Sequence, residues 1–335
     1  MAEVVNRKVV LAKRPDGMPT LDCFEVVEEQ LGDPQAGQAL IDVEHLSIDA
    51  FIRTTLDADE GLHGSLPERA TVMALGVGRV RSSGDDSLSQ GDVVFGPMGA
   101  QTHMLAPAAM FKKLDVSDAP ARAHLGVLGL TTGLTSYVGM VTVGGVGEGD
   151  TVVVSAAAGA VGSVACEIGR ILGARVIGIA GGADKVAYLE NELGIAAGID
   201  YKNEDVAERL AELAPDGVNL FFDNVGGELL DTVLDKIAPE ARVVICGAIS
   251  QYQHLGDVRG PSLYLRLAER NASMRGFTVD YHAGAHAEAI ERLSAWLQSG
   301  EFHVREHIVE GIENFPDALL MLFNGGHTGK LMVTP

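Results

Sequence analysis

The segment at residues 151–163, TVVVSAAAGAVGS, constrains the fold of this chain more than any other part of its 335 residues. The run TVVVS is rich in β-branched residues and shows no polar alternation, which is typical of a strand covered on both faces. Ala158, Gly159 and Gly162 follow at once, and such small residues permit a sharp turn and the close approach of a ligand. From Val161 onward apolar residues recur at intervals of three and four, which predicts a helix packed against the strand.

The turn at the start of this predicted helix is a candidate phosphate-binding site. Free backbone N–H groups and the positive end of the helix dipole favour a pyrophosphate at a helix N-terminus. The pattern A-A-x-G-A-V-G-S, however, lacks the first glycine of the common G-x-G-x-x-G fingerprint. Close packing of a helix on a strand also requires small residues, so the segment alone leaves both interpretations open.

Length and composition point to a globular protein of two domains. The chain is 47% hydrophobic, which suffices for a sizeable core, and it is longer than most single domains. No run approaches the ~20 apolar residues of a membrane span, and the N-terminus lacks an apolar signal core, which predicts a cytoplasmic location. Cys23, Cys166 and Cys246 lie far apart in the sequence and are interpreted as buried thiols rather than as disulfide partners or zinc ligands.

The formal net charge of −21 limits the partners of the chain. Nucleic acid and anionic membranes would be repelled at long range, so neither is expected as a general partner. An anionic cofactor would require a local positive patch, which makes lysine and arginine residues near the glycine turn informative.

The order of the predicted elements indicates an α/β protein with a β-rich first domain. Short runs bounded by Gly, Pro and Asp predict strands at 8–12, 23–28, 39–46, 76–80 and 92–95. Alternation typical of a doubly wound parallel sheet follows, with predicted strands at 151–156, 175–180, 197–201, 218–223, 241–247 and 273–279 and predicted helices at 161–172, 184–193, 205–214, 228–237 and 285–298. A last strand, helix and strand, at 305–309, 316–323 and 330–333, are expected to return to the first domain. The predicted division is therefore 1–126 with 304–335 for the β-rich domain and 127–303 for the dinucleotide-binding domain.

Several segments together resemble the zinc-independent medium-chain dehydrogenase/reductase superfamily and, within it, the family of prostaglandin/leukotriene reductases and plant alkenal double-bond reductases. The matching stretches are SIDAFIR at 47–53, LGVLGLTTGLTSY at 125–137, VSAAAGAVGS at 154–163, GIAGGADKVAYL at 178–189, IDYK at 199–202, FFDNVGGELLD at 221–231, CGAISQY at 246–252, MRGF at 274–277 and IVEGIENFPDAL at 308–319. The resemblance implies a Rossmann domain joined to a GroES-like catalytic domain, in a homodimer. It also implies NADPH-dependent reduction of the carbon–carbon double bond of α,β-unsaturated ketones or aldehydes, without a metal.

The cofactor is predicted to be NADP rather than NAD. If the second strand of the sheet ends near Ala180, Gly181 and Gly182 occupy the place where NAD enzymes hold an acid for the adenosine ribose. The resemblance implies that Lys185 and Tyr201 contact the 2′-phosphate. Taken alone, Lys185 would be interpreted as a solvated helix residue.

The resemblance assigns further cofactor contacts along the same edge of the sheet. Asn224 follows the fourth strand, where open α/β sheets bind ligands, although an asparagine there can also cap the next helix. Backbone groups after two later strands are implied against the nicotinamide, and the C-terminal return is implied to close over the cofactor. The complete set of predicted cofactor residues is Ala158, Gly159, Ala160, Val161, Gly162, Gly182, Lys185, Tyr201, Asn224, Cys246, Gly247, Ala248, Ile249, Ser250, Phe277, Val279 and Gly329.

Two tyrosines are the predicted catalytic residues. Hydride addition to an enone leaves negative charge on the carbonyl oxygen, so the site requires a hydrogen-bond donor there and a proton for the α-carbon. The resemblance favours Tyr264 for this role, and Tyr252 follows the CGAIS motif near the same cleft. For each tyrosine, anchoring of a loop is an equally open alternative, and solvent can also protonate an enolate.

The sequence does not favour metal catalysis, and it does not identify a particular substrate. SIDAF at 47–51 and ALGVG at 74–78 stand where zinc members of the superfamily carry a cysteine and a Gly-His-Glu motif, and His63 and His103 are interpreted as surface or loop residues. The tripeptide at 99–101, Gly-Ala-Gln, lacks the aromatic residue usual in the family's pocket, and the proline-rich loop of mammalian members is missing, so no prostaglandin substrate is inferred. Quinone reduction, and cofactor binding with little catalysis, are the competing functions.

Overall fold

The computed structural model describes residues 4–58, 64–252 and 257–335. The chain divides into two compact units: unit 1 comprises Met1–Leu125, Glu306–His327 and Leu331–Pro335, and unit 2 comprises Gly126–Arg305 and Thr328–Lys330. The sequence predicted that all of residues 304–335 join the first domain, whereas Thr328–Lys330 group with unit 2. This difference has a local cause, because the amide of Gly329 donates a hydrogen bond of 2.8 Å to the carbonyl oxygen of Ala158 in unit 2.

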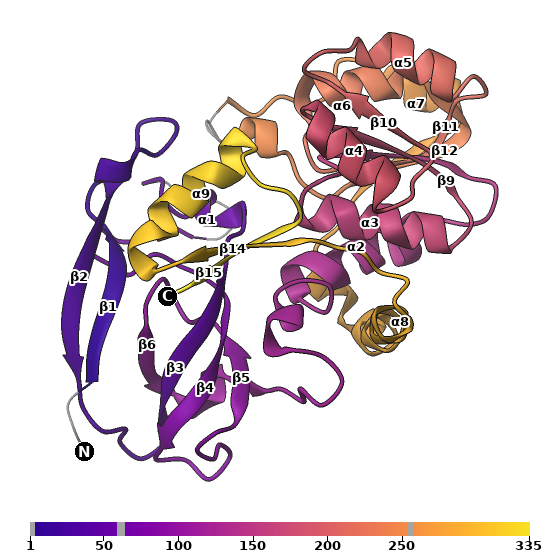
Figure 1. Ribbon diagram of the computed structural model, residues 1–335. Helices are drawn as coiled ribbons and strands as arrows, with labels where there is room; N and C mark the ends of the chain where they lie inside the picture. Colours follow the sequence, from indigo (N-terminus) through magenta and orange to yellow (C-terminus); the bar gives the residue numbers. More distant parts are fainter. Residues whose placement is uncertain (1–3, 59–63, 253–256) are drawn as a thin grey trace. The chain divides into compact units, whose positions relative to one another are not determined.

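Unit 2 is built on a six-stranded parallel sheet (Figure 1). Its strands are β8 (Thr151–Ser155), β9 (Arg175–Ala180), β10 (Ala197–Asp200), β11 (Val218–Asp223), β12 (Ile237–Ile245) and β13 (Ser273–Gly276). They lie in the order β10-β9-β8-β11-β12-β13, and every neighbouring pair is parallel. The chain therefore starts in the middle of the sheet, and the direction of strand addition reverses between β8 and β11. The predicted doubly wound sheet is confirmed.

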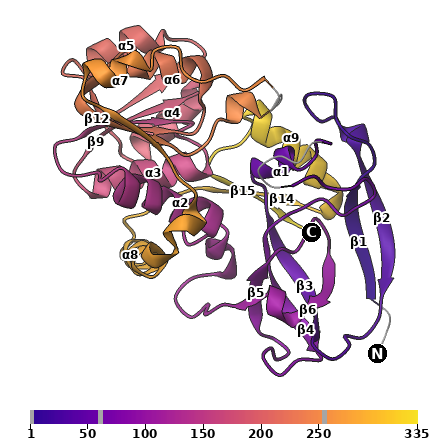
Figure 2. The same cartoon turned by 180° about the vertical axis from the view of Figure 1, so that it is seen from behind.

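Helices cover this sheet on both faces (Figure 2). Unit 2 contains the α-helices α2 (Thr135–Tyr137), α3 (Ala160–Ile171), α4 (Ala183–Asn191), α5 (Val206–Leu213), α6 (Gly227–Leu234), α7 (Leu265–Glu269) and α8 (His286–Ser299). It also contains the π-helical segments η4 (Leu130–Leu134) and η5 (Val138–Val143) and the 3₁₀-helical segments η6 (Ile249–Gln251) and η8 (Val279–Ala285). Leu210 of α5 and Val233 of α6 share a buried core with Phe221 of β11. In both views α3 lies on the other side of the sheet from α5 and α6. Right-handed crossovers require this arrangement, because the chain crosses toward β9 in one half of the sheet and toward β12 in the other.

Several boundaries in unit 2 differ from their predictions. The strand predicted at 241–247 runs over Ile237–Ile245, and the strand predicted at 273–279 ends at Gly276. The sequence predicted a helix over 228–237, but α6 ends at Leu234 and β12 begins at Ile237. Pro239 accounts for the difference, since proline cannot continue a helix and disfavours helical backbone in the residue before it. Ile237 instead pairs with Val218 of β11, and a register shift follows that pair.

Unit 1 is the β-rich, GroES-like domain. It contains a two-stranded antiparallel sheet, β1 (Val4–Leu11) and β2 (Phe24–Leu31), and a seven-stranded sheet of β3 (Gln38–Ser47), β4 (Gly76–Ser83), β5 (Val93–Gly96), β6 (His103–Pro107), β7 (Lys112–Lys113), β14 (Glu306–Glu310) and β15 (Lys330–Thr334). The helices are α1 (Phe51–Thr54) and α9 (Phe315–Asn324), with turns η1 (Leu21–Cys23), η2 (Ala108–Met110), η3 (Ala121–His124) and η9 (Ile312–Asn314). The sequence did not predict β6, which pairs with β3.

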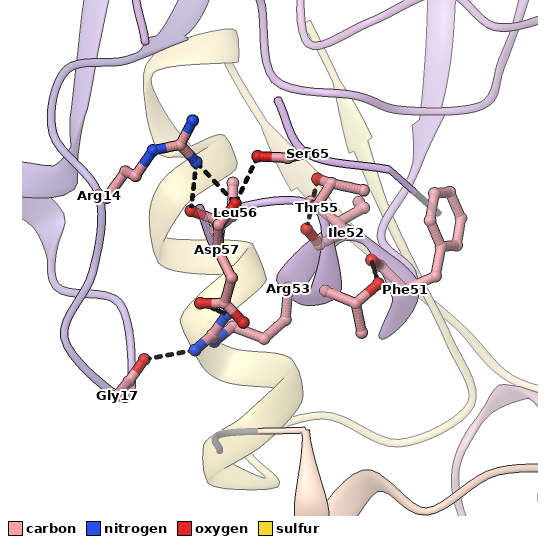
Figure 3. A network of polar contacts seen from close by, with 10 residues as sticks. Arg14, Gly17, Phe51, Ile52, Arg53, Thr55, Leu56, Asp57 and Ser65 are labelled. Atoms are coloured by element: carbon pink, nitrogen blue, oxygen red, sulfur yellow. Dashed lines mark hydrogen bonds and ion pairs between the residues drawn. The ribbon is translucent and has the colours of Figure 1, made fainter. Parts of the chain in front are cut away.

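A buried arginine fixes the segment after α1 in unit 1 (Figure 3). Arg53 is 1% exposed, and its guanidinium donates to Asp57 Oδ1 at 2.8 Å and to the carbonyl oxygen of Gly17 at 2.7 Å. Arg14 supports the same turn by donating to the carbonyl oxygens of Leu56 and Asp57. The arginine of the SIDAFIR stretch therefore ties the segment after α1 to the backbone at Gly17.

Candidate cofactor site

In the turn between β8 and α3, the left-handed backbone conformation is adopted by an alanine and not by Gly159. Ala156 has a φ of +48°, a left-handed conformation that residues with side chains rarely adopt, whereas Gly159, the N-cap of α3, has an ordinary φ of −82°. A Cβ on Gly162 would lie 2.3 Å from the carbonyl oxygen of Ala156. Gly162 therefore permits close packing of helix on turn, while Gly159 only begins the helix.

The first turn of α3 presents backbone donors at the edge of the sheet. The amides of Ala160, Val161 and Gly162 precede the helix ladder, whose bond from Ser163 N to Gly159 O measures 2.9 Å. Such amides and the positive end of a helix dipole suit a pyrophosphate. The turn also follows β8, next to the reversal of strand order, which is where doubly wound sheets bind dinucleotides.

Gly329 lies against this turn, as the sequence predicted for the C-terminal return, but its backbone N–H already forms a hydrogen bond within the protein. It forms an isolated parallel bridge with Gly159, and its N–H donates to the carbonyl oxygen of Ala158 at 2.8 Å. Its φ is +77°, and a Cβ there would lie 2.0 Å from the carbonyl oxygen of Arg305, so only glycine fits. Gly329 can thus border a cofactor in the turn but cannot donate its amide to one.

The two residues that directly follow β9 carry no acidic side chain. Gly181 and Gly182 follow the strand, and a Cβ on Gly181 would lie 2.8 Å from Cε1 of Tyr201. The main chain of Tyr201 is itself held there, because its N–H donates to the carbonyl oxygen of Ala180 at 3.1 Å. A side chain at position 181 would therefore require the ring of Tyr201, which is 54% exposed, to move, and with glycine there this place carries no ribose-binding acid.

Lys185 of α4 follows Gly182 by three residues in the sequence, and its side chain is half-buried. Burial lowers the pKa of its ammonium below the usual value, and the charge of Lys202 lowers it further. Within residues 4–58, 64–252 and 257–335, neither lysine forms an ion pair with an acid. A half-buried, unneutralised ammonium does not match the solvated helix residue that was the alternative interpretation, and it fits an anionic ligand such as a 2′-phosphate.

Asn224 does not cap the helix that follows it. The N-cap of α6 is Gly226, and the side-chain amide of Asn224 instead donates to the carbonyl oxygen of Ser155 at 2.8 Å. The Asn224 N–H donates to Ser155 Oγ, also at 2.8 Å. Since the side-chain NH₂ group is directed to β8, the amide oxygen Oδ1 is the group that Asn224 can offer to a ligand.

A buried carboxylate completes this network at the junction of β8 and β11. Asp223 is fully buried and accepts hydrogen bonds from Ser155 Oγ at 2.7 Å, from Val225 N at 2.9 Å and from Gly226 N at 3.0 Å. Burial raises the pKa of the Asp223 carboxyl, although these hydrogen bonds act in the opposite direction. The carboxylate therefore fixes Ser155, which in turn fixes Asn224.

The loop after β12 uses its amides within the protein. Cys246 N and Gly247 N donate to the carbonyl oxygen of Asp223, and Ile249 N and Ser250 N donate to the backbone of residues 224 and 225. The amide of Ala248 donates to the hydroxyl of Tyr252 at 3.3 Å. Carbonyl oxygens are therefore the groups that this predicted nicotinamide-binding loop can offer.

The two predicted catalytic tyrosines have different surroundings. Tyr252 is half-buried, burial raises the pKa of its hydroxyl, and this hydroxyl accepts the amide of Ala248, which supports the loop-anchoring interpretation. Tyr264 precedes α7 and is 57% exposed, and its hydroxyl makes no hydrogen bond to any residue that the structure describes. The Tyr264 hydroxyl is thus free to donate to a substrate.

The remaining predicted residues follow β13. Phe277 is half-buried, with its ring 2.8 Å from the position that a Cβ on Gly139 would take, and its centroid lies 6.5 Å from that of His282. The carbonyl oxygen of Val279 lies 3.0 Å from Nε2 of His286. His63 falls outside the described residues. No three His, Cys, Asp or Glu side chains are grouped as metal ligands in the described part of the chain.

Asp223 and Ser155 were not predicted from the sequence as residues of the site, although both lie in stretches that match the family. An acid that ends the apolar run VNLFFD was the available signal for Asp223, since a charge at the end of a buried strand requires partners. No signal in the sequence separates Lys202 from an ordinary surface lysine.

Comparison with known proteins covers most of the chain. Residues 7–114 match the family described as N-terminal domain of oxidoreductase, and residues 160–298 match the family described as zinc-binding dehydrogenase. The NADPH-dependent curcumin reductase of Escherichia coli is 33% identical over 98% of this chain and 96% of that protein. The NADP⁺-dependent 2-alkenal reductase of Nicotiana tabacum is 32% identical over 99% and 98%.

Solved structures give the same result for the fold. The crystal structure of CurA in complex with NADPH from Vibrio vulnificus matches with a TM-score of 0.91 and 33% identity, covering 98% of each chain. None of the described helices combines the length and the apolar character that crossing a bilayer requires.

Proposed function

Because the chain belongs to the zinc-independent medium-chain dehydrogenase/reductase family of alkenal and enone reductases, we propose that it uses NADPH to reduce the carbon–carbon double bond of α,β-unsaturated ketones and aldehydes. The protein is an NADP-dependent oxidoreductase. The observation that carries this proposal is the end of β9, where Gly181 and Gly182 replace the ribose-binding acid and Lys185 lacks an ion-pair partner among the described residues.

Unit 2 is proposed as the cofactor domain and unit 1 as the catalytic domain. The predicted cofactor residues are kept, with the donor and acceptor roles that the structure allows. The first-turn amides of α3 hold the pyrophosphate, and Lys185 and Tyr201 hold the 2′-phosphate. Asn224 accepts a hydrogen bond through Oδ1, and Gly329 borders the turn without donating.

The nicotinamide ring supplies the hydride when NADPH is bound. The chain has to bind and orient this cofactor and to stabilise the negative charge that develops on the substrate carbonyl oxygen. We assign this second task to Tyr264, whose hydroxyl has no partner among the described residues. Tyr252 is assigned to the shape of the 246–252 loop, where its hydroxyl holds the amide of Ala248.

A substrate panel tests the proposed function. Purified protein is mixed with NADPH or NADH and then with enones, enals or quinones, and both cofactor oxidation and product identity are followed. We expect NADPH oxidation with formation of the saturated ketone or aldehyde. An allylic alcohol as product, turnover of quinones alone, or NADPH binding without oxidation by any electrophile would each overturn the proposal.

Replacement of Tyr264 with phenylalanine should lower enone turnover about tenfold or more, since one hydrogen-bond donor to a developing oxyanion is lost. The Kd for NADPH should stay nearly unchanged, because no predicted cofactor contact is removed. Steady-state kinetics on several enones and NADPH titration measure the two effects. Tyr281→Phe is the matched control, since Tyr281 is 88% exposed and lies in η8, the segment after β13. Unaltered turnover of Tyr264→Phe on every enone would remove Tyr264 from the mechanism.

A homodimer is part of the proposal. β13 is the last strand in the described order of the unit 2 sheet, and all four of its residues are exposed. Met274 of this strand and Leu265 of α7 add exposed apolar area, and an open strand edge is a template for pairing with another chain. Light scattering of the purified protein measures the mass directly, and a monomer at micromolar concentration would contradict the dimer. The cytoplasmic location stays a prediction from composition.

A further inference from the structure

We propose that Lys202 is a second cation of the 2′-phosphate site and that Asp200 is the residue that positions it. This inference rests on the proposed use of NADPH and adds a residue that determines the preference for NADPH over NADH.

The exposed side chain of Lys202 lies over Gly181. A Cβ on Gly181 would lie 2.9 Å from Cε of Lys202 and 2.8 Å from Cε1 of Tyr201. The stem of Lys202 and the ring of Tyr201 therefore both lie over the glycine that stands in place of the ribose-binding acid. The ammonium of Lys202 is one bond beyond Cε, so it lies near Gly181, beside which we expect the NADP 2′-phosphate.

The charges around this glycine are unbalanced. Lys185 and Lys202 are close enough for the second charge to disfavour the first, and neither forms an ion pair among the described residues. The chain carries 46 acidic residues against 25 lysines and arginines, so acids to neutralise them are plentiful. Two adjacent ammonium groups without a direct ion pair repel each other in the empty protein and attract a phosphate monoester, which carries about −1.5 to −2 charges at pH 7.

Asp200, at the end of β10, does not neutralise Lys202 by contact, because its oxygens are directed elsewhere. Oδ1 accepts the amide of Gly182 at 2.7 Å and the amide of Lys202 at 3.1 Å, and Oδ2 accepts Nδ2 of Asn203 at 2.7 Å. The hydrogen bond from Asn203 is the largest of the effects that lower the pKa of this carboxyl. One carboxylate thus ties the turn after β9 to the turn after β10, which sets Lys202 beside Gly182.

Lys202→Ala is the main test, with binding measured by calorimetry on the full chain. The Kd for NADPH should rise about tenfold, because one charge-assisted contact is lost, while the Kd for NADH stays within about twofold. The Kd for adenosine 2′,5′-bisphosphate should rise by a similar factor to the Kd for NADPH. The salt dependence of NADPH binding should also decrease. Lys202→Arg should keep most of the preference, since the charge is retained.

Lys236→Ala is the matched control, because Lys236 lies in the same unit and pairs with Asp235 at 3.3 Å. It should leave both affinities unchanged. Equal weakening of NADPH and NADH by Lys202→Ala, or no change in either, would overturn the role of Lys202.

Asp200→Asn tests the positioning role. It should reduce the ratio of NADH to NADPH dissociation constants, because weakening the tie between the two turns should outweigh the gain from removing a negative charge near Lys202. A fall in thermal stability with an unchanged ratio would show that Asp200 is only structural.

Lys185→Ala separates failure of this inference from failure of the proposed function. If Lys185→Ala lowers the NADPH preference and Lys202→Ala does not, only the role of Lys202 fails. If the unmodified protein binds NADH as tightly as NADPH, and Lys185→Ala weakens both equally, the proposed use of NADPH fails as well.

Discussion

Replacing Gly162 with alanine should destabilise unit 2 by about 2 kcal/mol, as expected for overpacking in a tightly packed region. Helix propensity alone predicts the opposite, since alanine is favoured over glycine within a helix by about 1 kcal/mol. The packing effect dominates because the new Cβ would lie 2.3 Å from the carbonyl oxygen of Ala156 and 2.8 Å from Cα of Ala157, and these are backbone atoms that cannot rotate away.

The same substitution should weaken NADPH binding by at least about tenfold, because the turn that presents the α3 amides has to move. Urea unfolding measures the first effect and NADPH titration the second. Gly159→Ala is the matched control. Its φ of −82° suits alanine, and its Cβ would lie 3.2 Å from the nearest atom, so the cost should stay below about 1 kcal/mol. Equal costs at the two positions would show that close packing does not distinguish them.

Replacing Asp223 with alanine should lower the free energy of unfolding by on the order of 3 kcal/mol, since three donors, two of them on buried residues, lose their acceptor. These donors are Ser155 Oγ, Val225 N and Gly226 N. NADPH affinity should fall as well, because Ser155 Oγ accepts the amide of Asn224 and so helps to hold it at the cofactor edge. Urea unfolding and NADPH titration measure the two effects. Wild-type stability and affinity in this variant would refute the network.

Asp223→Asn is the conservative control and gives the prediction a pH dependence. An asparagine keeps one acceptor oxygen for the same donors, so it should cost less than alanine. Burial raises the pKa of Asp223 above its reference value of 3.8, so the folded state holds this proton more strongly than the unfolded state. Between the two pKa values, stability from this group therefore falls as pH rises. The wild-type advantage over Asp223→Asn should decrease across that window in urea unfolding, and an advantage that grows with pH would contradict the raised pKa.

Much of the fold could be predicted from local patterns. β8, β9 and β11 lie within one residue of their predicted positions, because continuous apolar runs bounded by glycine and aspartate are strong signals of buried strands. The errors lie where local signals compete. The helix predicted over 228–237 ends at Leu234, since Pro239 and pairing with Val218 favour a strand over the apolar helical pattern.

The candidate site was predictable only in part. The first-turn amides of α3 follow from the position of a glycine turn before a helix, and the acid-free end of β9 can be read from Gly181 and Gly182. The sequence did not show which acceptor each N–H group of the site is directed to. The amide of Gly329 is used by Ala158, and the amide of Asn224 is used by Ser155, although both residues reach the predicted edge.

The sequence by itself determined that strands alternate with helices, that a small-residue turn precedes α3, and that no acid follows β9. These are local properties, set by side-chain size, periodicity and backbone freedom within a few residues. The tertiary structure decided which of two similar glycines is irreplaceable, which hydroxyl meets the carboxylate of Asp223, and that Lys185 and Lys202 are neighbours. Asp223 and Ser155 are 68 residues apart in the chain, and only the order of strands in the sheet brings them to 2.7 Å. Strand order depends on contacts between distant segments, which local periodicity does not encode.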